Sequence, residues 1–139
     1  MAEVRYLTLD EVIGLHTEIL EWTGSPESPL LRAGDLESVL AKPRNAAWYE
    51  GADLIRQAVL LGVGISQSQA FLDGNKRAAF AAADVFLRIN GFVFEGNPMD
   101  LARWLEAVAE ASRELRDTRT AEFESWLRPF VAPIPAHPE

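Results

Sequence analysis

The chain has 139 residues, 48% of them hydrophobic and 24% charged, which fits one globular domain with its own core. The formal net charge of −8 argues against direct nucleic-acid binding, which needs a basic face. The chain has no cysteine and only two histidines, His16 and His137, which excludes disulfides, a thiolate nucleophile and a histidine-based metal cluster. Neither a signal peptide nor an apolar run long enough to cross a bilayer is visible, so we expect a cytoplasmic protein with no membrane partner.

The first third of the chain predicts one amphipathic helix and one short helix. Residues 8–11 (Thr-Leu-Asp-Glu) have the spacing of a capping box, and apolar residues follow at helical intervals to about residue 21. A loop rich in glycine and proline should follow over 22–34. Asp35 is then expected to cap a short helix that Pro43 ends.

Two strongly apolar segments in the middle of the chain predict the centre of the fold. Residues 52–68 and 75–90 contain few polar side chains, so both should be buried helices. Asp84 and Arg88 are four residues apart in the second segment and can pair. Gly91 is a natural C-terminal stop for that helix.

The remaining residues predict two more helices and a tail. Asn97-Pro98 is a start signal for one helix, and a last helix is expected over 120–127. Only Phe92-Val93-Phe94 suggests a strand, and it is short for a sheet. The proline-rich residues 129–139 should be extended or flexible. We therefore expect an all-α, single-domain helical bundle over 1–128, built around two buried central helices.

The segment between the two central helices predicts an anion site. Asp73-Gly74 marks a tight turn and Asn75 begins the next helix, so free backbone N–H groups and the positive end of the helix dipole face the turn. Lys76 and Arg77 add cations where a helix normally prefers acids, which favours a bound phosphate. Asp73 beside it could hold a magnesium ion. The alternative interpretation is a plain helix–helix turn with solvated Lys76 and Arg77.

The same segment resembles the signature of the Fic/Doc family, His-x-Phe-x-(Asp/Asn)-(Gly/Ala)-Asn-(Gly/Lys)-Arg. The chain matches it at six positions: Phe71, Asp73, Gly74, Asn75, Lys76 and Arg77. Lysine at the next-to-last position is the form found in death-on-curing (Doc) toxins, whereas AMP-transferring Fic enzymes have glycine there. The resemblance to Doc covers most of the chain, to about Arg113.

This resemblance implies a specific activity. Doc proteins are toxins that transfer the γ-phosphoryl group of ATP to a threonine of elongation factor Tu and so arrest translation. By family, Asp73 would hold Mg²⁺, while Gly74, Asn75 and Lys76 would bind phosphates. Arg77 would stabilise the transferring charge, and Phe71 would pack the motif onto the core. The family also implies a small antitoxin whose helical tail covers the active-site groove.

The sequence departs from the family at the histidine that takes the proton from the attacking hydroxyl, where Gln69 stands. A carboxamide can orient a hydroxyl but is no base near neutral pH, and general-base help is worth roughly a hundredfold to ten-thousandfold in rate. We therefore expect nucleotide binding with weak or absent transfer. Gln69 is either an introduced substitution, which the intact remainder of the motif favours, or a natural loss that leaves a binding module.

Other polar and aromatic residues have structural interpretations. His16 is expected to be a packed, hydrogen-bonded histidine on the first helix. Trp48 and Tyr49, expected in a loop, could either form a wall for a ligand or cover the core. Trp104 and Trp126 fit helical apolar faces and should belong to the core.

Overall fold

Two apolar helices, α3 (Leu54–Ser68) and α4 (Asn75–Ile89), form the centre of the protein in the computed structural model, which describes residues 3–135. His137 therefore lies outside the described residues, as does the end of the predicted tail. The two central helices pack along each other, and small residues bring them close: a Cβ on Gly62 would lie 3.4 Å from the Ala83 Cβ. Among residues 3–135, no helix combines the length and apolar character needed to cross a membrane.

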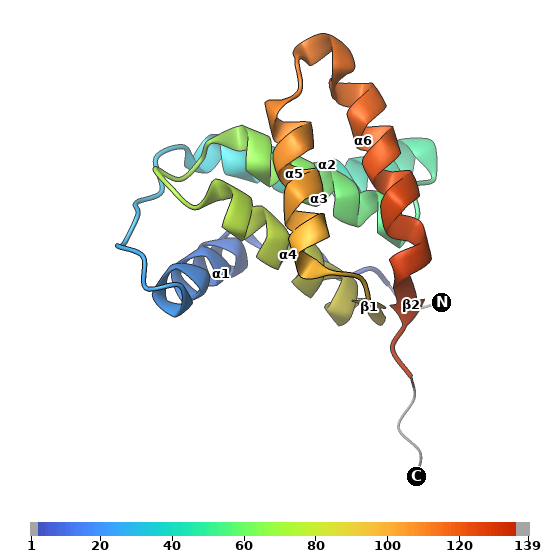
Figure 1. Ribbon diagram of the computed structural model, residues 1–139, viewed down its shortest axis with the longest axis horizontal. Helices are drawn as coiled ribbons and strands as arrows, with labels where there is room; N and C mark the ends of the chain where they lie inside the picture. The colour runs from blue at the N-terminus through green and yellow to red at the C-terminus, as the bar shows by residue number, and fades with distance from the viewer. Residues whose placement is uncertain (1–2, 136–139) are drawn as a thin grey trace.

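Helices α1 (Leu9–Trp22) and α2 (Ala33–Glu50) cover this centre, with α1 against α4 and α2 against α3 (Figure 1). The predicted capping box is confirmed. Thr8 accepts a hydrogen bond from the Glu11 backbone N–H, and the Glu11 carboxylate accepts one from the Thr8 N–H.

The prediction that Pro43 ends a short helix is wrong, because α2 continues through it to Glu50. Proline in a helix removes one backbone hydrogen bond and costs roughly 3 kcal/mol. The ring of Pro43 is fully buried and Ala46 on the next turn is buried too, so packing offsets that loss. Asp35 lies in the first turn of α2, where it complements the helix dipole, while the N-cap is Arg32.

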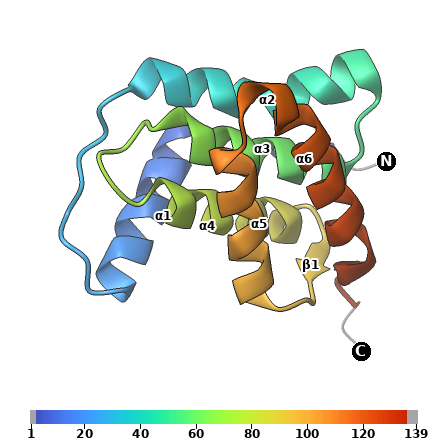
Figure 2. The same ribbon diagram turned by 45° about the horizontal axis from the view of Figure 1, so that its top comes forward.

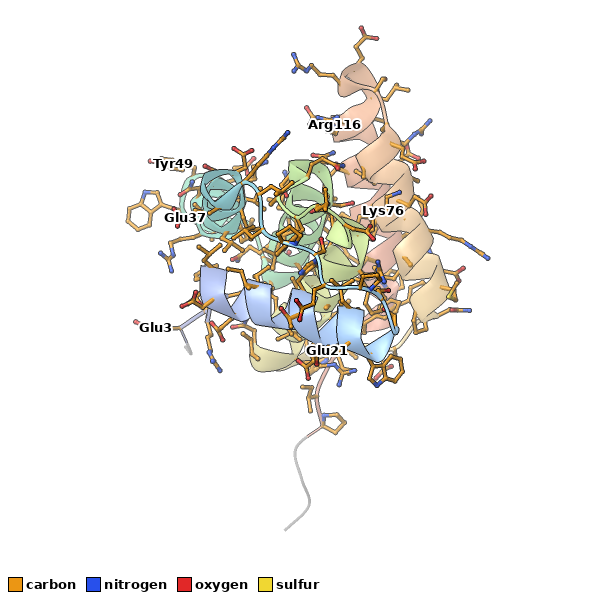
Figure 3. The ribbon with its side chains drawn as sticks, turned by 90° about the vertical axis from the view of Figure 1, so that its left-hand side faces the viewer. Glu3, Glu21, Glu37, Tyr49, Lys76 and Arg116 are labelled. Carbon is orange, nitrogen blue, oxygen red and sulfur yellow. The ribbon has the colours of Figure 1, made fainter. Side chains whose placement is uncertain are left out.

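The continuation of α2 places Trp48 and Tyr49 on its last turn instead of in a loop. Their exposed fractions are 82% and 81%, so they do not cover the core. Tyr49 borders a shallow surface cavity, and Trp48 does not. Figure 3 shows Tyr49 on the outer side of α2. Gly51 ends the helix in the left-handed conformation, with φ of 66°.

Helices α5 (Pro98–Glu110) and α6 (Arg113–Leu127) form a second layer in front of α3 and α4 (Figure 2). Asn97 caps α5 as predicted, accepting from the Met99 N–H at 2.8 Å. Helix α6 begins well before the predicted residue 120. Its first half has no buried apolar residue, so no periodicity marked it; only Phe123 and Leu127 are fully inside. Trp104 and Trp126 are partly buried and stack with Phe123 against the core.

The expectation that residues 92–94 are too short for a sheet is wrong. Strand β1 (Phe92–Phe94) pairs antiparallel with β2 (Val131–Pro133), which follows a 3₁₀ turn over Arg128–Phe130. Val93 lies opposite Ala132. Of the predicted tail, Pro129 and Phe130 thus belong to the 3₁₀ turn, while residues 131–133 are extended and paired with β1.

Candidate functional site

The loop between α3 and α4 lines an open cleft of about 450 Å³, here called the motif cleft. All six residues that the sequence selected as site residues lie on it, together with Ser66 and Leu72. The lining residues are Ser66, Gln69, Leu72, Asp73, Gly74, Asn75, Lys76 and Arg77. The predicted site residues therefore share one surface.

Asn75 holds the loop in shape from inside. Its side chain is only 8% exposed; Oδ1 accepts from the Phe71 N–H at 3.0 Å and Nδ2 donates to the Phe71 carbonyl at 2.9 Å. Phe71 itself is buried, as predicted. Since the Asn75 side chain is committed to the loop, only its backbone N–H remains for a phosphate.

His16 attaches the loop to α1, which confirms the prediction of a packed, hydrogen-bonded histidine. It is 2% exposed, stacks on Phe71 and lies with Nε2 2.7 Å from the Asp73 carbonyl oxygen. Because a carbonyl oxygen only accepts, Nε2 is the protonated ring nitrogen. This histidine supports the motif from behind.

The loop between α1 and α2 forms a second support that sequence reasoning missed. It runs beside the α3–α4 loop in both Figure 1 and Figure 2. Ser28 Oγ accepts from the Asp73 N–H at 2.7 Å and donates to the Asp73 carbonyl at 3.2 Å. The Leu31 N–H donates to the Ala70 carbonyl, and the Leu72 N–H to the Pro29 carbonyl. Ser28 is 45 residues from Asp73 in the sequence, so no local pattern indicates their contact.

The start of α4 presents backbone donors to the motif cleft. Gly74 is its N-cap and provides no side-chain acceptor, so the N–H groups of the first helical turn, at residues 75–77, have no capping partner. Two features favour glycine at position 74. Its φ is 82°, and a Cβ there would lie 3.0 Å from His16 Nε2. Uncapped donors at the positive end of a helix form a site suited to anions.

Lys76 forms ion pairs with two acidic side chains, whereas the sequence suggested an unpaired cation. Its Nζ lies 3.2 Å from Glu110 Oε1 and 3.7 Å from Glu106 Oε1, both on α5, and Figure 3 shows it beside that helix. The hydrogen bond that Lys76 donates to the Glu110 carboxylate, with the charge of Glu106, raises the pKa of the Lys76 ammonium. Because α5 neutralises one of the two motif cations, Lys76 favours a bound anion less than the sequence predicted.

Arg77 spans the cleft towards the α1–α2 loop. Its Nη1 donates to Ser25 Oγ at 2.6 Å and Thr23 Oγ1 at 3.0 Å, and Nη2 lies 3.5 Å from Asp73 Oδ2. Arg77 thus has one carboxylate, at 3.5 Å, and two neutral hydroxyls, so its positive charge is less compensated than that of Lys76, which has two carboxylates. Among the motif cations, Arg77 is the better placed to attract a phosphate.

Gln69 occupies a strained position at the end of α3. Its φ of 53° is the one positive value at a non-glycine residue between residues 3 and 135. The left-handed conformation is costly for a residue with a Cβ, and such strain concentrates at functional sites. The side chain is exposed on the motif cleft, where it can hydrogen-bond a hydroxyl.

Ser66, one turn before Gln69, is a second residue that sequence reasoning missed. It lines the motif cleft, is 1% exposed, and its Oγ has no hydrogen-bond partner. A buried hydroxyl without a partner is uncommon. The available signal was the serine that directly follows the apolar run at residues 58–65 of α3.

Asp73 is the acidic residue of the motif cleft. Its side chain is 75% exposed; Oδ1 accepts from the Gly74 N–H at 2.8 Å, while Oδ2 faces Arg77. The described residues contain no cluster of three or more histidine or acidic side chains that could hold a metal by themselves. A single carboxylate still fits Mg²⁺, which binds through one or two carboxylates plus substrate phosphates.

The comparison with known protein families agrees with this geometry. The sequence profile of the Fic/DOC family matches residues 6–87, more than half of the chain. This range includes α1, α2, α3 and the motif cleft, and it ends within α4. No curated protein matches the chain. On the family match, the chain belongs to the Fic/DOC family.

Proposed function

We propose that this protein is a Doc-type toxin whose motif cleft binds ATP and transfers its γ-phosphoryl group to a protein threonine, with elongation factor Tu as the family's target. One observation carries the proposal: three uncapped backbone N–H groups, Arg77 and Asp73 all face the same cleft beside position 69. Phosphoryl transfer depends mainly on positioning and charge stabilisation, and these groups provide both.

Within the cleft each residue has a distinct role. The N–H groups of residues 75–77 would bind phosphate oxygens along the dipole of α4. Arg77 would stabilise charge on the transferring group, and Lys76 would contact the phosphates after exchanging its ion pairs with α5. Asp73 would hold Mg²⁺, whose role when bound is to neutralise the negative charge of the nucleotide phosphates.

Gln69 sets the level of activity in this proposal. Its amide can align an acceptor hydroxyl but cannot remove the proton, so transfer should be slower by roughly a hundredfold to ten-thousandfold than with histidine. Gln69 is exposed and lines the cleft, so histidine should fit there without a change in fold.

A second candidate is favoured by Gln69 itself: a non-catalytic module that binds a nucleotide or a protein partner. AMP transfer is a third candidate. Lys76 disfavours it, because the AMP-transferring members of the family have glycine at that motif position. The family also suggests a cognate antitoxin whose helical segment would lie over the cleft.

The deciding experiment compares wild type, Gln69→His and Gln69→His/Arg77→Ala with purified elongation factor Tu. Each protein is incubated with ATP labelled on the γ-phosphate and, separately, on the α-phosphate. Gamma label on the factor with Gln69→His, lost with Arg77→Ala, supports the kinase. Alpha label would establish AMP transfer instead. Magnesium-dependent ATP binding without any label would establish the binding module.

A further inference from the structure

A cavity of about 570 Å³ lies between α2, α3 and α6 and shares no lining residue with the motif cleft. Three cations from three helices line it: Lys42, Arg56 and Arg116. Figure 3 shows Arg116 on α6, in a different part of the surface from Lys76. In a chain with a net charge of −8, this gathering of cations is unusual.

Two of these three cations have no ion-pair partner among residues 3–135. Arg56 is paired, with Nη1 3.0 Å from Glu124 Oε1 and Nη2 3.8 Å from Glu50 Oε1. For Lys42 and Arg116, by contrast, no carboxylate of the described chain lies within 4.0 Å, although the cavity's walls contain Glu50 and Asp117. The lining therefore has two cations available for a ligand.

Arg116 lines the cavity with a guanidinium that is incompletely hydrogen-bonded. Its Nε is buried and has no hydrogen-bond acceptor, one of two such side-chain atoms in the described chain. Because Nε has almost no accessible surface, an anion in the cavity would contact the Nη groups of the same guanidinium. A buried charged N–H group without an acceptor costs stability, so native proteins seldom retain one without a reason. A guanidinium edge binds the paired oxygens of a phosphate or a carboxylate.

The remaining lining residues of the cavity suit a ligand that carries hydroxyl groups. Asp117 can accept hydrogen bonds, and Thr120 Oγ1 donates to the Arg116 carbonyl at 2.7 Å while its lone pairs stay available. The Gln67 amide donates to the Val108 carbonyl at 3.5 Å, which leaves its oxygen as an acceptor. Leu60 contributes an apolar wall.

We propose that the α2–α3–α6 cavity binds a small organic anion, in which a phosphate or carboxylate group contacts Arg116 and Lys42 and hydroxyl groups contact Asp117 and Gln67. Its volume is within the range of small-molecule sites, which run from about 300 to 1,000 Å³. The proposal does not depend on the activity of the motif cleft.

The test titrates the full chain with three probes and follows the Nε–H signal of Arg116 by NMR. Glucose 6-phosphate and gluconate present a phosphate and a carboxylate on similar hydroxylated bodies, and glucose is the uncharged control. We expect saturable shifts with one or both anions and none with glucose, and the same titration in Arg77→Ala, because the motif cleft is a different site. An unmoved Arg116 signal with both anions, or an equal response to glucose, overturns the proposal.

A variant pair separates a binding role of Arg116 from a structural one. Arg116→Met keeps the apolar stem and removes the unpaired N–H, whereas Arg119→Met removes an arginine of the same helix that lies outside the cavity and pairs with Glu122. Affinity for the responding anion should fall roughly tenfold to a hundredfold in Arg116→Met, the value of a charge-assisted hydrogen bond, and stay unchanged in Arg119→Met. Without ligand, Arg116→Met should melt no lower than wild type. A clearly lower melting temperature, or a failure to fold, would show a structural residue and overturn the proposal.

Discussion

The imidazole of His16 lies flat on the ring of Phe71, with ring centroids 3.6 Å apart and planes 10° from parallel. Phe71 is part of the motif, and His16 also donates to the carbonyl of Asp73, two residues further along. One buried side chain of α1 therefore fixes the motif through both packing and a hydrogen bond.

Replacing His16 should separate these two contributions. We expect His16→Ala to lower the free energy of unfolding by about 2 to 4 kcal/mol, as for other large-to-small changes in a core. His16→Phe keeps a stacking ring and loses the hydrogen bond, so it should cost only about 1 kcal/mol; Ser28 still donates to the same Asp73 carbonyl. Urea unfolding measures both values. Equal losses in the two variants would mean that the stack contributes little.

The backbone conformation of Gln69 should lower the free energy of unfolding relative to a variant with glycine at this position. Its φ of 53° suits glycine, so Gln69→Gly should raise the free energy of unfolding by up to about 1 kcal/mol. Gln69→Val adds a β-branched side chain in the same conformation and should destabilise. Thermal unfolding of the three proteins checks the order. If Gln69→Gly is less stable than wild type, the side chain makes a contact that compensates the strain.

The acidic pair on α5 should weaken anion binding at the motif cleft. Glu106→Gln with Glu110→Gln removes two negative charges beside Lys76, so ATP affinity should increase by roughly threefold to tenfold at low salt and by less at high salt. Isothermal titration calorimetry at two salt concentrations measures this change. The matched control is Glu114→Gln, an exposed acid in the first turn of α6. Weaker ATP binding in the double variant would mean that the pair positions Lys76 instead of competing for it.

The junction of α3 and α6 should be sensitive to acid. Arg128 donates to both Asp53 oxygens, at 2.7 and 3.2 Å, and to Glu124 at 2.8 Å. The hydrogen bond from Arg128 is the main cause of a lowered Asp53 pKa, with help from the Arg56 N–H that Asp53 caps. Because the folded pKa is below its usual value, the stabilisation is complete above that usual value and is lost as the pH falls through the folded pKa.

Arg128→Met should therefore destabilise the protein at neutral pH by about 1 kcal/mol, a modest value because both partners are partly exposed. The difference from wild type should shrink as the pH falls below roughly 4, where the Asp53 carboxyl of the unfolded chain begins to take up a proton that the folded protein does not yet bind. Urea unfolding across this range is the measurement. A difference that stays constant down to acid pH would assign the effect to lost packing of the arginine stem.

Local sequence patterns correctly predicted the helix starts that depend on neighbouring residues. They failed for elements whose ends or pairing depend on contacts with distant segments. The capping box at Thr8 and the Asn97-Pro98 start are short-range chemistry, and both are present. Pro43 was misread because its compensation, burial of the ring against other helices, cannot be seen in one segment. Strand β2 needed a partner more than thirty residues away.

The same division holds for the site. The sequence predicted six of the eight residues that line the motif cleft, because the motif is contiguous. It did not predict the acids of α5 on Lys76 or the serines that hold Asp73 and Arg77, since both sets come from distant segments. The electrostatics of the cleft therefore had to come from the fold.

The pairing of β1 with β2 also determines where the molecule can be attached to something else. The chain leaves the bundle after β2 at the bottom of Figure 1, while the motif loop is on its left side. A dye or a coupling to a sensor surface attached at Ile134, which is 45% exposed just after β2, would start from this paired segment. Ligands could then reach the cleft without passing the attachment, which makes the segment after β2 a suitable attachment point for immobilised binding measurements.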